Sequence, residues 1–324
     1  MGMELSNYVE LSTLALDLNY MKGYEALRES AAWIDLSVRG TIRVNGDDRA
    51  RLLHAITTNH IHQLRPGTGC YAFFLDAQGR VLADANILCR KDHFLLDTEP
   101  ETRERIFGHL DHYIIADDVT LEDTTARTTS IAVEGPRSAE VLARIGASVP
   151  EADYAFVPWG SRLVARLNST GSPGFFVFAP VDQKPALIAQ LGIEQADAEA
   201  ARIVRLEHGK PRYSEDITHR FLAQETNQSH ALHFNKGCYL GQEIVERVRT
   251  RGLLHRRLMA VDIHGTTAPA PGTRLTAKGK VAAEVTSAAF SPALARVVAL
   301  AYVRTEFAQS GSTVDCGDLQ ATVR

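Results

Sequence analysis

The chain has 324 residues, of which 45% are hydrophobic and 23% are charged, proportions typical of soluble globular proteins. Because a single hydrophobic core usually stops growing at about 250–300 residues, this length predicts two or three domains. The formal net charge of −4, from 35 basic and 39 acidic side chains, excludes a strong overall electrostatic attraction to nucleic acid.

The first segment, residues 1–21, lacks the features of a targeting or membrane sequence. Its apolar positions are interrupted by Glu4, Glu10 and Asp17, and no apolar run in the chain approaches the ~20 residues that span a bilayer. The first arginine is Arg28, whereas a mitochondrial presequence would be rich in arginine and poor in acids. We therefore expect a cytoplasmic protein with no membrane partner.

The first half of the chain has the pattern of an α+β unit. Helical spacing of apolar residues predicts helices over Tyr24–Leu36 and Glu101–Tyr113, and Asp47 can cap another that runs through Ile56. The predicted strands of this half are Thr41–Val44, Cys70–Leu75, Arg80–Leu88 and Phe94–Leu96.

A second α+β unit begins near residue 128. Its predicted strands are Ser130–Val133, Arg162–Leu167 and Phe175–Phe178, and its helices start at Ser138, Lys184 and Asp197. After Arg257 the helical periodicity disappears, and the short apolar runs Leu258–Ile263, Val281–Thr286, Val297–Val303 and Gln320–Val323 alternate with Gly and Pro turns. The sequence thus predicts an α+β protein with domains at 1–127, 128–255 and 256–324, the last a small β-barrel or sandwich.

One cysteine stands in an unusual sequence environment. The four cysteines, Cys70, Cys89, Cys238 and Cys316, form no CxxC pair, which favours reduced thiols over a disulfide framework. Cys238 lies two residues after Lys236, and apolar spacing predicts a helix that opens near Gly241. A nearby lysine and a helix N-terminus both favour the thiolate, so Cys238 is a candidate nucleophile. The alternative is a small buried hydrophobic residue, which is the common fate of a lone cysteine.

Basic residues gather around this cysteine. They are Lys236, Arg247, Arg249, Arg251, Arg256 and Arg257. An anionic partner such as RNA is one interpretation. A solvated helix face with pairs such as Glu243 with Arg247 explains the pattern equally well, and no interleaved aromatic series suits base stacking. We therefore do not expect nucleic acid as a partner, and an RNA-binding module is only a third hypothesis.

Two further side-chain patterns could carry chemistry. His230, His233 and Cys238 are types of metal ligand, but their spacing does not match a structural zinc site, so no resident metal is expected, while a cluster shared with a partner stays possible. Asp84 lies in a predicted strand just after Gly79. A strand carboxylate that faces a cleft can bind an amine or a cation, whereas strand alternation alone favours a solvent-facing residue.

The run KGCYLGQE, Lys236–Glu243, resembles the signature of the YgfZ family of proteins, which are related to the glycine-cleavage T protein. The resemblance continues through Arg205, Glu207, Gly209, Pro211, Asp216-Ile217, Glu225-Thr226-Asn227, Arg247, Gly252 and Arg257-Leu258. Nearer the N-terminus, the residues that resemble the wider T-protein superfamily are Ala26-Leu27-Arg28, Asp35-Leu36-Ser37, Thr57-Thr58-Asn59, Gly79 and Gly135-Pro136.

The resemblance implies a ring of two α+β domains and a C-terminal β-barrel around a central channel that holds tetrahydrofolate. It also implies a role with iron–sulfur client or carrier proteins, in the assembly or repair of their clusters. Cys238 would be the functional thiol, in a loop shaped by Lys236, Tyr239, Gly241, Gln242 and Glu243. Arg205 and Glu225 would help to hold the folate.

The same resemblance leaves an enzymatic alternative. T proteins transfer an aminomethyl-derived carbon to tetrahydrofolate with an aspartate on the strand after a glycine turn, and Asp84 falls at that place. However, the T-protein motif T-G-E-x-G-Y-E is here Thr170–Phe176, with Ser172 and Phe176 in place of its glutamates. A folate-dependent one-carbon transferase is therefore the second hypothesis.

Overall fold

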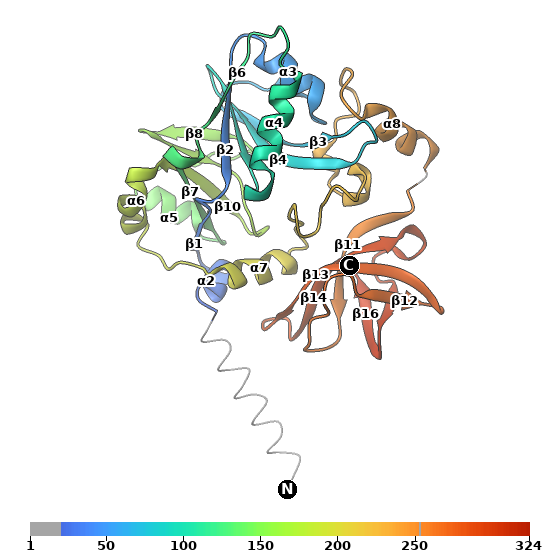
Figure 1. Ribbon diagram of the computed structural model, residues 1–324. Coiled ribbons are helices and arrows are strands. Elements are labelled where there is room, and N and C mark those ends of the chain that lie inside the picture. The colour runs from blue at the N-terminus through green and yellow to red at the C-terminus, as the bar shows by residue number, and fades with distance from the viewer. Residues whose placement is uncertain (1–20, 253) are drawn as a thin grey trace.

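The computed structural model describes residues 21–252 and 254–324, which fold into two α+β units and a β-barrel (Figure 1). The first sheet has the strand order β3-β4-β5-β2-β6, and all its neighbouring strands are antiparallel. These strands are β2 Gly40–Asn45, β3 Thr68–Leu75, β4 Val81–Cys89, β5 Phe94–Thr98 and β6 Thr120–Asp123. Two helices, α3 Arg49–Ile56 and α4 Arg103–Tyr113, share a hydrophobic core with this sheet.

The second sheet has the order β1-β7-β10-β9-β8. Its strands are β1 Ala32–Asp35, β7 Thr128–Glu134, β8 Phe156–Trp159, β9 Arg162–Ala165 and β10 Gly174–Pro180. The helices α5 Ser138–Arg144 and α6 Lys184–Leu191 contribute Leu142 and Leu187 to a core on one face of this sheet. Both α+β units predicted from the sequence are thus confirmed.

The predicted helix over Tyr24–Leu36 is wrong in its second half. Helix α2 covers only Tyr24–Glu29, and β1 pairs antiparallel with β7, with Ala32 opposite Glu134. Trp33 and Ile34 are both buried, in cores on opposite faces of the sheet. Tertiary packing on two faces therefore overrides a local pattern that a helix fits equally well.

The C-terminal unit is a closed barrel with the strand order β11-β14-β13-β12-β15-β16, as predicted for this region. Its strands are β11 Arg256–Ile263, β12 Arg274–Ala277, β13 Lys280–Ser291, β14 Arg296–Arg304, β15 Thr313–Cys316 and β16 Leu319–Val323. The sequence does not predict β12 and β15, because four-residue strands offer too few alternating positions to recognise.

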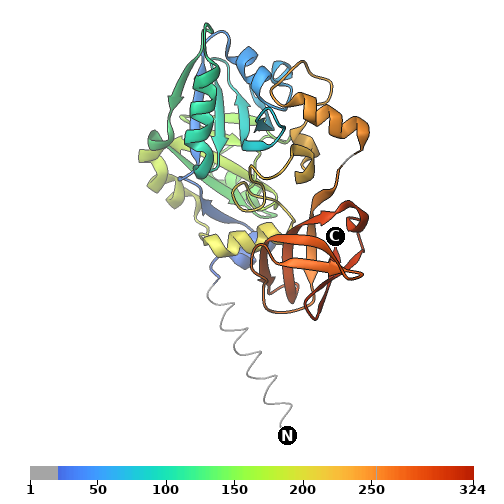
Figure 2. The same ribbon diagram turned by 45° about the vertical axis from the view of Figure 1, so that its right-hand side comes forward.

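The segment between the second sheet and the barrel connects all three units. Helix α7, Ala198–Glu207, begins at the cap Asp197, whose carboxylate accepts a hydrogen bond from the Ala200 amide at 2.7 Å, and it packs beside the barrel. The chain then passes along the first sheet before it enters helix α8, Gln242–Arg251, and the barrel (Figure 2). The domain boundaries at 127/128 and 255/256 stay a prediction. Strand β1 belongs to the second sheet, although it lies in the sequence before residue 128.

Every helix within residues 21–252 and 254–324 is too short or too polar to span a bilayer.

Candidate functional site

A cavity of about 1000 Å³ lies between the two α+β units. Its wall includes Ile34 of β1, Asp84 of β4 and Phe176 of β10, together with residues 208–213 that follow α7. A volume of this size, with mixed apolar and charged lining, can enclose an organic ligand of several rings. It is therefore the first candidate for a binding site.

Asp84 is the carboxylate of this cavity, and the structure places it as a buried residue with 7% exposure. Tyr71 of β3 pairs with Asn86 of β4, two positions from Asp84, so the side chains of Tyr71 and Asp84 lie on the same face of the sheet. The Tyr71 hydroxyl donates to Asp84 Oδ2 at 2.6 Å. Burial and then the nearby Glu99 carboxylate raise the pKa of Asp84 to about 7. Such a carboxyl group can hold or release a proton near neutral pH.

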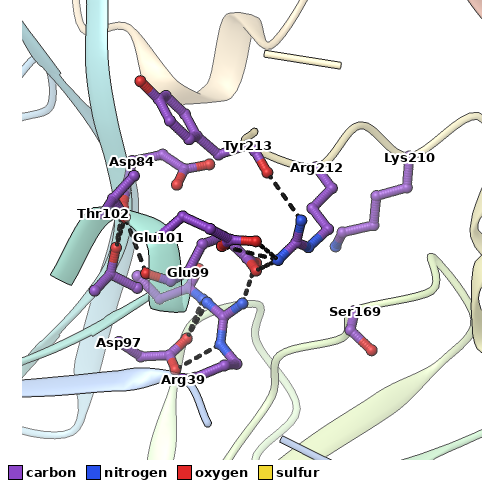
Figure 3. A network of polar contacts seen from close by, with 12 residues as sticks. Arg39, Asp84, Asp97, Glu99, Glu101, Thr102, Ser169, Lys210, Arg212 and Tyr213 are labelled. Atoms are coloured by element: carbon purple, nitrogen blue, oxygen red, sulfur yellow. Dashed lines mark hydrogen bonds and ion pairs between the residues drawn. The ribbon is translucent and has the colours of Figure 1, made fainter. Parts of the chain in front are cut away.

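A charge network fixes the surroundings of Asp84 (Figure 3). Arg39 donates from Nε and Nη2 to the two oxygens of Asp97, each at 2.8 Å, and from Nη1 to Glu99. Arg212 donates to Glu99 at 2.9 Å and to Glu101 at 2.7 Å. Because these arginines hold the pKa of Glu99 below its ordinary value, Glu99 stays anionic, and its charge favours the protonated form of Asp84.

The opposite wall is built by the loop after β9. Lys210 donates from Nζ to the backbone oxygen of Asn168 at 2.7 Å and to its side-chain oxygen at 2.6 Å. The buried Glu134 carboxylate accepts hydrogen bonds from the amides of Ser169, at 2.5 Å, and Thr170, at 2.9 Å. Glu134 thus holds the loop that carries the altered T-G-E-x-G-Y-E motif against the second sheet.

An aromatic stack forms another part of the cavity wall. The ring of His230 stacks on Tyr71, with centroids 5.3 Å apart, and lies nearly parallel to Tyr154 at 6.4 Å. Tyr154 adopts a left-handed backbone with φ of +61°, which is strained for a tyrosine and is typical of ligand sites. Flat aromatic walls of this kind suit a flat heterocyclic ligand.

The two residues predicted to hold folate have different positions. Arg205 lines the cavity, but its guanidinium is already paired with Glu215 at 2.5 Å and Asp216 at 2.6 Å. Glu225, in the short helix Ala223–Thr226, does not line the cavity and pairs with Arg256 of the barrel at 2.8 Å. Glu225 therefore joins the segment before α8 to the barrel and does not face the cavity.

Cys238 lies outside the cavity, on the surface of the molecule. The preceding Lys236 is buried, and its Nζ donates to the backbone oxygens of His54 and Thr57, both at 2.6 Å, and of Asn59 at 2.8 Å. These carbonyls belong to the end of α3 and the turn that follows it. Burial lowers the pKa of Lys236 to about 7, while the three acceptors favour the ammonium. Lys236 thus anchors the loop to the first α+β unit.

The other residues of the KGCYLGQE run shape this loop. The Tyr239 ring is buried 4.8 Å from Lys236 Nζ, and the Tyr239 amide donates to Gln242 Oε1 at 3.3 Å. Gly241 precedes α8 with φ of +80°, which confirms the predicted helix start. Glu243 is exposed and pairs with Arg247 at 2.5 Å, as a solvated helix face predicts. None of these side chains lines the cavity, so the described structure separates the candidate residues into a cavity around Asp84 and a surface loop around Cys238.

The sequence does not single out several of the residues that line the cavity. Lys210 and Arg212 flank Pro211 of the resemblance motif, so their positions were a usable signal. Tyr71 and Tyr154 come from separate segments, and no local pattern marks them as one wall with His230, which the sequence offered only as a type of metal ligand.

Comparisons with known proteins agree with this architecture. Residues 15–236 match the model of the GCVT N-terminal domain, and residues 256–323 match the glycine cleavage T-protein C-terminal barrel domain. An aminomethyltransferase of Rubrobacter xylanophilus is 29% identical, covering 87% of this chain and 78% of its own. A chloroplastic protein of Arabidopsis thaliana named as a transferase is 28% identical, and the match covers 91% of this chain and 70% of that protein. The crystal structure of aminomethyltransferase T from Bartonella henselae superposes with a TM-score of 0.85 at 22% identity. The match covers 93% of this chain and 87% of that chain and shows the same fold.

Proposed function

Because this chain belongs to the glycine-cleavage T-protein family, we propose that it binds tetrahydrofolate or a related folate in its cavity and serves iron–sulfur proteins through Cys238. The proposal places the chain in the YgfZ branch and in the cytoplasm. The observation that carries it is the exposed Cys238 thiol on a loop that the buried Lys236 ammonium holds in one place. A thiol held in this way can meet a macromolecule that could not enter the cavity.

The cavity residues fit a folate. The stack of Tyr71, His230 and Tyr154 suits a flat ring system, and Asp84 can hydrogen-bond to ring nitrogens. Arg166 and Lys210 also line the cavity and can attract the carboxylates of the ligand. A bound reduced folate would supply a carrier for one-carbon units. The residues of this chain would orient it and set the protonation of Asp84.

The test is replacement of the thiol in cells that lack the native protein. Cys238→Ala is expected to abolish the recovery of an iron–sulfur enzyme activity, such as that of aconitase, while purified Cys238→Ala protein still binds tetrahydrofolate. Cys316→Ala, at a partly exposed cysteine of the barrel, is the matched control and should behave as the wild type. Full recovery of client activity by Cys238→Ala would contradict the proposed role of the thiol.

A folate-dependent one-carbon transferase is the second candidate, because Asp84 has a pKa of about 7 in the cavity. Relatives named aminomethyltransferase add support, whereas Ser172 and Phe176 replace the two motif glutamates. Transfer of a formaldehyde equivalent to tetrahydrofolate that Asp84→Asn abolishes and Cys238→Ala leaves intact would favour this candidate.

An RNA-binding role through the arginines of α8 predicts affinity that falls steeply with salt.

A further inference from the structure

The lysine and arginine side chains that line the cavity differ in one respect. Five of the six pair with a carboxylate at 3.2 Å or less, and these are Arg39, Arg166, Arg202, Arg205 and Arg212. The sixth is Lys210, and no carboxylate among residues 21–252 and 254–324 lies within ion-pair distance of its ammonium. Lys210 therefore presents a positive charge to the cavity that the described part of the chain does not neutralise.

Glu134 is the carboxylate whose charge acts most strongly on Lys210, but both of its oxygens are already used. Its Oε1 accepts from the amide of Ser169 at 2.5 Å and from the Ser169 hydroxyl at 2.7 Å. Its Oε2 accepts from the amide of Thr170 at 2.9 Å and from the Thr170 hydroxyl. Glu134 is therefore not free to turn toward Lys210. Burial is the main cause that lowers the pKa of Lys210, as expected for an ammonium without a close anion.

The Lys210 side chain is held in one direction at both of its ends (Figure 3). The Lys210 amide donates to the Arg205 backbone oxygen at 3.0 Å, and the Arg205 guanidinium donates to the Lys210 backbone oxygen at 2.7 Å. At the other end, Nζ donates to the backbone and side-chain oxygens of Asn168, at 2.7 Å and 2.6 Å. Because an ammonium has three N–H groups, one remains for a ligand that enters the cavity.

We propose that Lys210 is an anion-binding position of the cavity and that it binds a carboxylate of the ligand. A carboxylate would accept the third N–H in a charge-assisted hydrogen bond and would neutralise the ammonium. The inference rests on the proposed function in taking the ligand to be a folate, whose glutamate tail carries carboxylates. It goes further because it assigns the choice of ligand class to one residue, which lies between Gly209 and Pro211 but is not among the residues of the resemblance. A separate small carboxylic acid offers the same chemistry, and the test distinguishes the two sources.

Calorimetric titration of the purified full-length protein with two reduced pterins tests this assignment. Tetrahydrofolate carries the glutamate tail, whereas 6-methyltetrahydropterin has the same reduced ring without the tail. Lys210→Met removes the charge and should weaken tetrahydrofolate binding by about tenfold, while binding of 6-methyltetrahydropterin stays unchanged. Lys210→Arg keeps a positive charge and should bind tetrahydrofolate more tightly than Lys210→Met. The matched control is Lys280→Met, at an exposed position of the barrel, which should bind both pterins as the wild type does.

Thermal unfolding with glutarate, a diacid without a ring, identifies the source of the carboxylate. If the folate tail occupies the position, glutarate should stabilise the free wild type but not the protein saturated with tetrahydrofolate. If a separate small acid occupies it, glutarate should stabilise both. In either case the stabilisation should be lost in Lys210→Met. Equal tetrahydrofolate binding together with an equal glutarate response in the wild type and Lys210→Met overturns the inference.

A purely structural role of Lys210 predicts a different result for the unliganded protein. Because Lys210→Met removes a charge without an acidic partner, the unliganded variant should unfold at no lower temperature than the wild type. A variant that unfolds at a lower temperature and binds both pterins more weakly would show that Lys210 only holds Asn168, which overturns the inference. If the wild type binds neither pterin, the folate part of the proposed function fails, and the glutarate response alone decides the role of Lys210.

Discussion

Asp84 shows how strongly the surroundings of one residue decide its chemistry. On strand alternation alone, a residue at this position could face solvent, but Asp84 faces the cavity with 7% exposure, and Glu99 places a negative charge nearby. Its pKa of about 7 is above the ordinary value of 3.8 for an aspartate. The folded protein therefore binds more protons than the unfolded chain between these two pH values.

This difference predicts a pH-dependent stability. The stabilising contribution of protonated Asp84 is complete below about pH 4 and is lost as the pH rises through about 7. Because Asp84→Asn is permanently neutral, it should exceed the wild type in free energy of unfolding by up to about 4 kcal/mol at pH 8, at ~1.4 kcal/mol per pKa unit. Urea unfolding at pH 5 and pH 8 measures the difference in free energy of unfolding between Asp84→Asn and the wild type, and Asp318→Asn, at an exposed position, is the control. If this difference does not increase from pH 5 to pH 8, the pKa of Asp84 is not raised.

At the scale of elements, the position of the Cys238 loop depends on how α8 begins. Gly241 has φ of +80°, and a side chain there would lie 2.6 Å from the backbone oxygen of Asp76 in the β3–β4 turn. A real Cβ cannot occupy that place, so the turn and the start of α8 are built around a glycine. The same contact sets the Cys238 loop against the first sheet.

Gly241→Ala should therefore destabilise the protein by about 2–4 kcal/mol, since it combines left-handed strain with a backbone clash. Gly252→Ala is the matched control at the other end of α8, because Gly252 has φ of +63° and open space around it. It should cost only about 1 kcal/mol. Thermal unfolding of both variants measures the difference, and equal losses would mean that the contact with Asp76 has no energetic weight.

At the scale of the whole molecule, one buried carboxylate connects the barrel to the α+β units. Asp216 is fully buried, and its Oδ2 accepts from Arg205 at 2.6 Å and from the Arg212 amide at 3.1 Å. Its Oδ1 accepts from the hydroxyl groups of Thr286, at 2.6 Å, and Ser287 in the barrel strand β13. Removal of the Asp216 carboxylate leaves the buried Arg205 guanidinium paired with Glu215 alone.

Asp216→Ala is therefore expected to cost about 3–5 kcal/mol and to uncouple the barrel from the rest of the chain. Differential scanning calorimetry should show one transition for the wild type and a broadened or double transition for the variant. Asp315→Ala, at an exposed barrel position, is the control and should retain the single transition. A single transition of unchanged midpoint in Asp216→Ala would exclude this coupling.

The same residues show the limits of prediction from sequence. The start of α8 at Gly241 and the Glu243–Arg247 pair follow from local spacing, and the structure confirms both. The sequence places Lys236 beside the thiol, whereas the Lys236 ammonium donates to carbonyls that lie 182 and 179 positions away along the chain. Such a long-range partner leaves no trace in the local pattern.

The α+β class, the C-terminal barrel and the resemblance to T proteins follow from the sequence, because periodicity, turn residues and short motifs are local properties of the chain. In contrast, the packing of distant segments makes residues 32–35 a strand of the second sheet and brings Tyr71, Tyr154 and His230 together as one wall. The same packing of distant segments places Cys238 outside the cavity. Burial, pKa and ligand geometry depend on which distant segments pack together, and that information is distributed over the whole chain.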